Sequence, residues 1–155
     1  MSPLVGSGLQ FGSRRNYWLA FVTNLGSNTI QSLTYDSSTG VMTNVGTVAT
    51  GTGPYGVAVD ATNHIVFVTN LDSNTVQSLT YDSSTGAMTN VETVTTGTEP
   101  KGVAVDATNH IVFVANLDSN TVQSLTYDSS TGVMTNVGTV ATGSGPVGAA
   151  VAYEG

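Results

Sequence analysis

The stretch NLDSNTVQSLTYDSSTG occupies residues 70–86 and recurs without change at residues 116–132. A third copy at residues 24–40, NLGSNTIQSLTYDSSTG, differs only at Gly26 and Ile30. The copies begin 46 residues apart (70 − 24 and 116 − 70), with no insertion between them. A constant period of this length is typical of propeller blades and of helical repeats, so the repetition predicts an architecture before it predicts an activity.

Within one period the apolar runs are short and rich in Val, Ile, Thr, Phe and Tyr, and no 3.6-residue apolar pattern is present. This excludes helical repeats and favours four strands per period, joined by turns of Asn, Asp, Ser and Gly. In the middle repeat we expect the strands, named A to D, at residues 55–60, 64–70, 75–82 and 88–97. Each strand pairs with the next, which predicts an all-β protein built of four-stranded antiparallel blades.

The composition supports this fold class and limits the partners. Charged residues make up 8% of the 155-residue chain, far below the usual value of about a quarter. A net charge of −7 argues against nucleic acid and anionic membrane as partners, because both repel acidic proteins. No apolar run approaches the roughly 20 residues of a membrane-spanning helix. We therefore expect a soluble protein, and the absence of cysteine leaves its compartment unknown.

The N-terminal stretch GSRRNYWLAFV is similar to a twin-arginine signal, but Thr23, Asn24 and Gly26 interrupt its apolar part and no small-residue cleavage site follows. We interpret it as two arginines before a strand, and not as a signal peptide. Residues 1–16 are expected to be an irregular N-terminal segment. Residues 17–155 are expected to form one unit of three blades, with repeats that start near residues 24, 70 and 116.

A known family carries the same motifs. The segment FVTNLDSNTVQSLTYDSSTG, followed by TGTEPKGVAVDATNHIVFVAN, resembles the YVTN-type β-propeller repeat and is similar to the blades of lactonase-like seven-bladed propellers. The resemblance covers the chain from about Trp18 to Ala152. It implies four-stranded blades around a central channel. It also implies a range of functions that includes surface proteins, binding modules and a few enzymes.

The resemblance implies acidic, Arg and His residues around the central pocket of the lactonases, and this set does not map onto the sequence. Both arginines precede the first repeat, and His64 and His110 recur at the start of strand B, where we expect exposed or capping residues. Asn70, Asp72 and Asn74 have the spacing of the first half of a calcium loop, but the second half is missing. We therefore expect no catalytic residues, no metal and no cofactor.

The expected function is a non-catalytic scaffold or binding module, and the alternative is a lactonase-like hydrolase with a central-channel pocket. In propellers the D–A and B–C loops surround one mouth of the channel. At these loops, some polar or aromatic residues differ between the repeats. These are the candidate contacts for a small ligand: Tyr55, Asp72, Glu99, Lys101 and Asp118.

The strand count predicts self-association. Three B–C–D sets and three A strands give twelve strands, but the first B strand, residues 17–24, has no clear A strand before it. The last A strand, residues 147–153, has no B strand after it. Closed propellers usually have about four to eight blades, so three blades need a partner. We expect a six-bladed homodimer in preference to a nine-bladed trimer or a piece of a longer propeller. Residues 8–11 (GLQF) are an alternative first A strand.

Overall fold

A computed structural model describes residues 17–155, in which all regular secondary structure except one short turn of helix is strand. Three antiparallel sheets follow one another along the chain. The first sheet has three strands, β1 (Tyr17–Asn24), β2 (Thr29–Asp36) and β3 (Met42–Ala49). The second has four strands, β4 (Pro54–Asp60), β5 (Ile65–Asn70), β6 (Thr75–Tyr81) and β7 (Met88–Thr95). The third also has four, β8 (Pro100–Asp106), β9 (Ile111–Asn116), β10 (Thr121–Tyr127) and β11 (Met134–Ala141).

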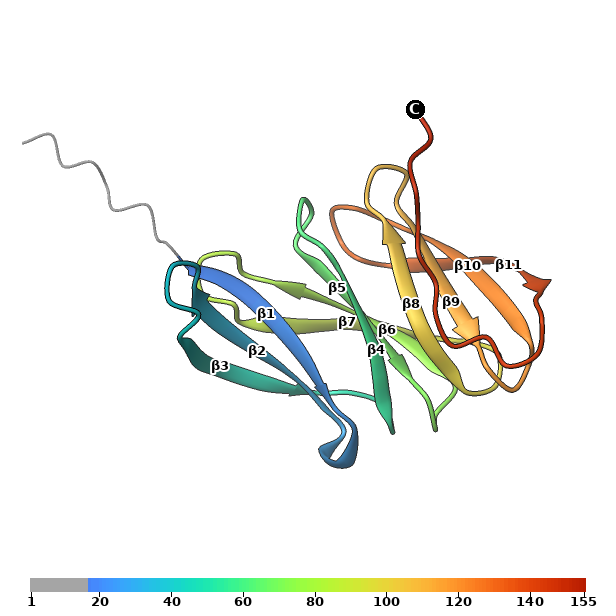
Figure 1. Cartoon of the computed structure of the whole chain (residues 1–155), viewed down its shortest axis with the longest axis horizontal. Helices are drawn as coiled ribbons and strands as arrows, with labels where there is room; N and C mark the ends of the chain where they lie inside the picture. The colour runs from blue at the N-terminus through green and yellow to red at the C-terminus, as the bar shows by residue number, and fades with distance from the viewer. Residues whose placement is uncertain (1–16) are drawn as a thin grey trace, which may run out of the picture.

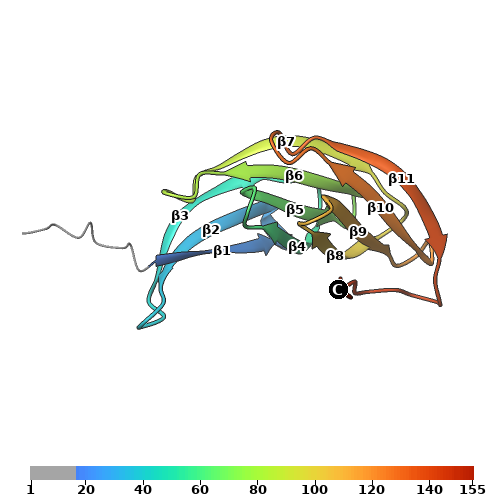
Figure 2. The same ribbon diagram turned by 90° about the horizontal axis from the view of Figure 1, so that it is seen from above.

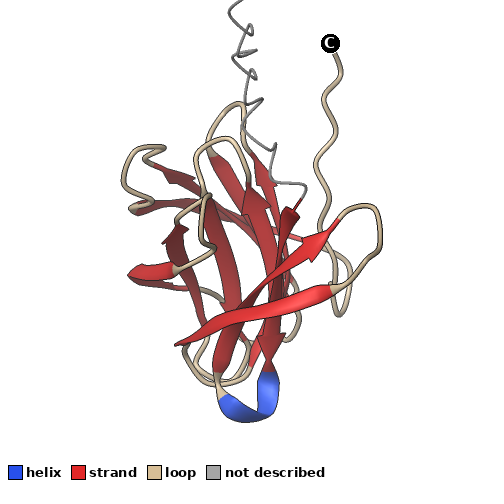
Figure 3. Ribbon diagram, turned by 90° about the vertical axis from the view of Figure 1, so that its left-hand side faces the viewer, coloured by secondary structure: helices blue, strands red, loops and turns tan. Residues whose placement is uncertain are grey.

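The sheets lie side by side along an arc, as the blades of a propeller do (Figures 1 and 2). The A strands β4 and β8 lie toward the concave side, and the D strands β3, β7 and β11 lie on the convex side. Among the described residues the only helix is the 3-10 turn η1 (Leu25–Ser27), which is blue in Figure 3. The predicted all-β fold of antiparallel, propeller-like blades is therefore confirmed. No helix in residues 17–155 has the length and apolarity to cross a membrane.

Each C–D turn is specified by its residues and recurs with the period. Asp82 accepts hydrogen bonds from the backbone N–H groups of Ser84 at 2.7 Å and Thr85 at 3.1 Å. Asp36 and Asp128 do the same in the other two blades. Glycine takes the left-handed conformation that closes each turn, at residues 40, 86 and 132. An aspartate bonded to its own turn and a glycine with positive φ together end strand C and begin strand D.

The core lies between the sheets. We call the side of a blade toward the next blade its front face, and the opposite side its rear face. Between the second and third blades, the front-face residues Ile65, Phe67 and Val76 pack against a rear face formed by Val112, Val114, Leu125, Tyr127 and Met134. Between the first and second blades the equivalent residues meet, namely Phe21 and Ile30 against Val66, Val68, Leu79, Tyr81 and Met88. One apolar interface, repeated with the sequence, therefore holds the blades together.

The interface between the second and third blades also contains a buried polar contact. Asp60 is fully buried and accepts a hydrogen bond from the Tyr127 hydroxyl at 2.7 Å. It also accepts the backbone N–H groups of Thr62 and Asn63, both at 3.0 Å, and the Asn63 amide at 2.7 Å. Burial opposes the ionisation of Asp60, but these donors outweigh it and lower the pKa of the carboxyl group. Burial, together with the bond to Asp60, raises the pKa of Tyr127.

The structure corrects two of the predicted strand positions. Residues 147–153, expected to form the last A strand, belong to no sheet, so the described chain has eleven strands and not twelve. The physical reason is that a strand needs hydrogen-bonding partners, and no described B strand lies beside this segment. His64 and His110 do not begin strand B, because they close the A–B turns with left-handed backbone, φ 57° in both. Residues 8–11, the alternative first A strand, lie outside the described residues.

Candidate functional site

The loops expected around the channel mouth are tied together in pairs. In the first pair, the backbone N–H of Gly53 in a D–A loop donates to the side-chain oxygen of Asn28 in a B–C loop at 2.9 Å. Glu99 donates to Asn74 at 2.9 Å, and Gly145 donates to Asn120 at 2.7 Å, in the equivalent places. Because each bond joins one loop of each kind, both kinds lie on the same rim of the blades.

Two of the five candidate ligand contacts meet on this rim. The Lys101 ammonium lies over the Tyr55 ring, 5.2 Å from its centroid, in a cation–π contact. The backbone carbonyl of each residue is hydrogen-bonded to a threonine of the preceding blade. The Tyr55 carbonyl accepts from the Thr23 hydroxyl at 2.8 Å, and the Lys101 carbonyl accepts from the Thr69 hydroxyl at 2.6 Å. The single lysine of the chain is therefore positioned at the start of an innermost strand, beside an aromatic ring that is 48% exposed.

The other three candidate contacts are carboxylates on the paired loops. The D–A loop of Glu99 is also bonded to the following B–C loop, which carries Asp118, since Leu117 donates its backbone N–H to the Glu99 carbonyl at 2.9 Å. Asp72 lies in the B–C loop one period earlier, where a Cβ added at Gly53 would be 2.6 Å from its carboxylate oxygen. Asp72 and Asp118 are exposed, and Glu99 is half-buried. The rim thus carries one cation and three acidic groups, a set able to bind a polar ligand and to accept a proton.

No three His, Asp or Glu side chains within residues 17–155 converge closely enough to hold a metal ion. The loops of the rim are held together by hydrogen bonds from backbone N–H groups to asparagine side chains, such as the bond from Glu99 to Asn74. The described rim carries an ammonium group and three carboxyl groups.

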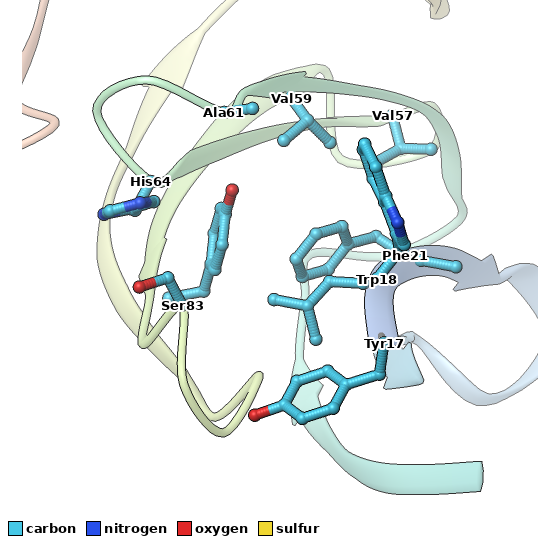
Figure 4. Close-up of a pocket in the computed structure, with 11 residues that line it drawn as sticks. Tyr17, Trp18, Phe21, Val57, Val59, Ala61, His64 and Ser83 are labelled. Carbon is cyan, nitrogen blue, oxygen red and sulfur yellow. The ribbon is translucent and has the colours of Figure 1, made fainter. Parts of the chain in front are cut away.

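A groove in the described part of the chain lies away from this rim. This groove of about 630 Å³ runs between β1 and β4, and none of the five candidate contacts lines it. Figure 4 shows Trp18 and Phe21 on one side of it and Val57 and Val59 on the other. Sequence reasoning missed this groove. The available signal was a break in the repeat, since Trp18 stands where the other two copies have histidine.

The backbone at Glu99 provides a test of the rim geometry. Glu99 has φ 53°, whereas its counterparts Gly53 and Gly145 are glycines with φ 67° and 65°. A residue with a Cβ costs about 1–2 kcal/mol in this conformation, partly offset by the greater freedom of glycine in the unfolded chain. We expect Glu99→Gly to stabilise the protein by about 0.5–1 kcal/mol, measured by urea unfolding.

The matched control for this change is Gly53→Ala, at the same position of the preceding loop. It combines a positive φ with a Cβ that would lie 2.6 Å from an Asp72 oxygen, so it should destabilise the protein by about 1–2 kcal/mol. A loss of stability in Glu99→Gly would show that this loop does not hold the left-handed conformation.

Comparison with known proteins agrees with the blade architecture. A family model described as "Lactonase, 7-bladed beta-propeller" matches residues 13–95 and 82–151. Among solved structures, a putative 6-phosphogluconolactonase from Bacteroides fragilis is similar to the chain, with a TM-score of 0.77 and 22% identity. The similarity covers 84% of this chain and 37% of that one. The comparison with curated proteins found no match.

Two further structures have the same relation to the chain. The Pseudomonas aeruginosa periplasmic gluconolactonase matches with a TM-score of 0.74 and 22% identity, over 82% of this chain and 38% of that one. A protein from Lactobacillus plantarum matches with a TM-score of 0.76 and 25% identity, over 86% of this chain and 40% of that one. The chain therefore spans well under half of the length of each of these proteins.

The family match corrects the expected function. The expectation of a non-catalytic scaffold or binding module is wrong, because the family model favours the alternative, a lactonase-like hydrolase. The expectation was made because the acidic, Arg and His set of the lactonases does not map onto this sequence. Repeated residues specify the blades, whereas the chemistry of a propeller depends on the few residues that meet at its channel.

Proposed function

The chain belongs to the seven-bladed β-propeller lactonase family, and we propose that it supplies three blades of a lactonase-like hydrolase whose substrate binds at the mouth of the central channel. The observation that carries the proposal is the family match, which runs from residue 13 to residue 151. The substrate class that we propose is supported by the names of two similar structures, a putative 6-phosphogluconolactonase and a gluconolactonase. It is a cyclic ester of a sugar acid.

The proposed site consists of the five residues on the rim: Tyr55, Asp72, Glu99, Lys101 and Asp118. Hydrolysis adds the oxygen of water to the ester carbonyl carbon, breaks the ring C–O bond and transfers a proton to the leaving alkoxide. A carboxylate of the rim would accept the proton of the attacking water. The Lys101 ammonium, held over the Tyr55 ring, would bind a negatively charged group of the substrate or the developing oxyanion.

We further propose that the channel is completed by a second copy of the chain, which gives a six-bladed homodimer. The described blades form an open arc, and its two end faces carry exposed apolar side chains such as Met42 and Val140, 66% and 69% exposed. Side chains equivalent to them are covered where two blades meet. Covering both end faces with a second arc removes apolar patches that would favour aggregation.

The hydrolase is tested with the purified 155-residue chain and two substrates, gluconolactone and its 6-phospho form. We expect hydrolysis above the rate in buffer, followed as acid release at constant pH. Lys101→Ala should raise the KM for the phosphorylated lactone on the order of tenfold, since a charged hydrogen bond is lost. The neutral lactone should be affected less.

The matched controls separate the rim from the rest of the acidic surface. Glu99→Gln and Asp118→Asn should each lower kcat, whereas Glu154→Gln, an exposed carboxylate outside the rim, should leave it unchanged. A folded protein that accelerates neither reaction would overturn the proposed activity. Equal effects of the rim and control variants would overturn the proposed site.

A further inference from the structure

The groove beside β1 has the position of an absent innermost strand. In the second and third blades, the A strand pairs with the B strand along its inner edge, as β4 does with β5 and β8 with β9. In the first blade, β1 is a B strand whose only described partner is β2. The groove of about 630 Å³ lies along the other edge of β1, beside which the structure describes no strand, and continues to β4 (Figure 4). Its lining includes apolar side chains from both strands, among them Phe21 of β1 and Val57 of β4, beside polar groups such as His64.

A segment with the sequence of an A strand lies without a sheet partner at the other end of the arc. Residues 146–151 read PVGAAV, and the two A strands begin PYGVAV and PKGVAV. The segment also follows the course of an A strand. A Cβ at Gly56 would lie 2.3 Å from the Lys101 carbonyl oxygen, and one period later a Cβ at Gly102 would lie 2.7 Å from the Val147 carbonyl oxygen. The third blade therefore holds this segment as the second blade holds β8.

The residue that ends the segment separates it from the other A strands. Asp60 and Asp106 end β4 and β8, and each accepts two backbone N–H groups of the following turn, which leads into the B strand of the same blade. The equivalent position is Ala152, which has no acceptor for such a turn. Without this turn the chain is not reversed into a B strand that would pair with the segment. We therefore look for its partner strand in another part of the assembly.

We propose that residues 146–152 of one copy add to the inner edge of β1 in a second copy, and that the second copy does the same in return. Within a single chain the two elements cannot meet, because β1 and the C-terminal segment lie at opposite ends of the arc (Figures 1 and 2). The inference rests on the proposed ring of two copies and does not depend on its hydrolase activity.

The repeat fixes the register of this contact. In both complete blades the A and B strands have the same pairing, for example Val57 with Val68 and Val103 with Val114. Adding the 46-residue period to the paired positions of β8, and subtracting it from those of β5, gives the pairs that we expect between copies. Residues 146, 149, 150, 151 and 152 pair with Asn24, Val22, Phe21, Ala20 and Leu19 of the partner subunit.

The end faces of the arc fit the same arrangement. Inside the chain, Phe67 packs against Tyr127 with ring centroids 4.8 Å apart, and Asp60 accepts the Tyr127 hydroxyl. One period on, Phe113 and Asp106 lie on the front face of the third blade, which no described blade covers. The tyrosine that completes this set is Tyr35 of the partner subunit, on the rear face of its first blade. Met42 is 66% exposed there, whereas the equivalent Met134 is 5% exposed between two blades.

Disulfide trapping tests the strand pairing, because the chain has no cysteine of its own. A tagged chain with Val22→Cys is mixed with an untagged chain with Ala149→Cys under mild oxidation. We expect a reducible pair of one tagged and one untagged chain as the main product, since paired strand positions bring Cα atoms within about 4.4–6.8 Å. The matched control replaces Ala149→Cys by Ala150→Cys, whose side chain points to the opposite face of the strand. It should give only the background of random oxidation.

Three outcomes would overturn the proposal. The first is the absence of a disulfide between tagged and untagged chains. The second is such a product no more abundant than with Ala150→Cys. The third is a double variant, Val22→Cys with Ala149→Cys, that forms the disulfide within one monomer. The double variant should instead give a covalent dimer. Trapping does not measure hydrolysis, so a failure here is distinct from a failure of the lactone assay. A tight dimer without the predicted disulfide would leave the activity intact and exclude this strand exchange.

Discussion

Replacing Phe67 by alanine is expected to lower the free energy of unfolding by about 3–5 kcal/mol, the usual cost of removing a fully buried aromatic ring. Phe67 is completely buried at the interface between the second and third blades, and its ring packs against Tyr127. The loss combines the apolar area with the cavity that remains, because strands on both sides are fixed by their hydrogen bonds. Urea unfolding of the variant and the parent protein measures it.

The repeat supplies the control. Phe113 is the same residue one period later, at the open end of the arc, where it is only half-buried. In dilute protein, where two copies separate, Phe113→Ala should cost clearly less than Phe67→Ala. At concentrations where the ring closes, the two costs should approach each other. A loss below about 1 kcal/mol for Phe67→Ala would mean that the blades do not pack as described.

Replacing Asp60 by alanine is expected to cost about 2–4 kcal/mol, because hydrogen bonds to a charged group are stronger than neutral ones and their donors would be left unpaired. The change removes the acceptor for the buried Tyr127 hydroxyl and for two backbone N–H groups of the A–B turn. Asp106→Ala is the matched control, since Asp106 makes the same turn contacts without a tyrosine from its own chain. It should cost less in dilute protein.

Acid should have the same effect as this substitution. The pKa of Asp60 is lowered in the folded protein, so the folded state binds its proton less tightly than the unfolded chain does. The stabilisation is fully present above the ordinary value of 3.8 and is lost as the pH falls from there through the lower folded value. The parent protein should therefore lose stability on acidification below about pH 4, and Asp60→Ala should lose less over the same range. Identical pH dependence in the two proteins would contradict this assignment.

The blades could be predicted from the sequence because local signals and the period agree. The predicted A strand at residues 55–60 and B strand at 64–70 differ from β4 and β5 by one residue at their starts. The turns were specified by side chains that bond to their own backbone, as Asp82 does. The first B strand, residues 17–24, coincides with β1, although Tyr17 and Trp18 replace the turn residues of the other copies.

What the sequence could not supply depends on contacts between distant residues. The bond from Tyr127 to Asp60 joins residues 67 positions apart, and nothing local predicts it. The last A strand was predicted from its own pattern, but a strand exists only with a partner, and the described chain provides none for residues 147–153. The groove along β1 is the place where we propose that this segment of a second copy adds. The sequence predicted that Lys101 and Tyr55 lie on one rim. Their contact depends on the curvature of the arc, which the sequence did not specify.

Closure of the ring by a second copy of the chain is the central proposal for this molecule. Light scattering of the full 155-residue protein at micromolar concentration measures this directly. We expect a mass twice that of the 15.8 kDa chain, because within residues 17–155 no strand lies beside the inner edge of β1 and no blade covers either end of the arc. A well-folded monomer of 15.8 kDa at this concentration, or a trimer, would contradict it.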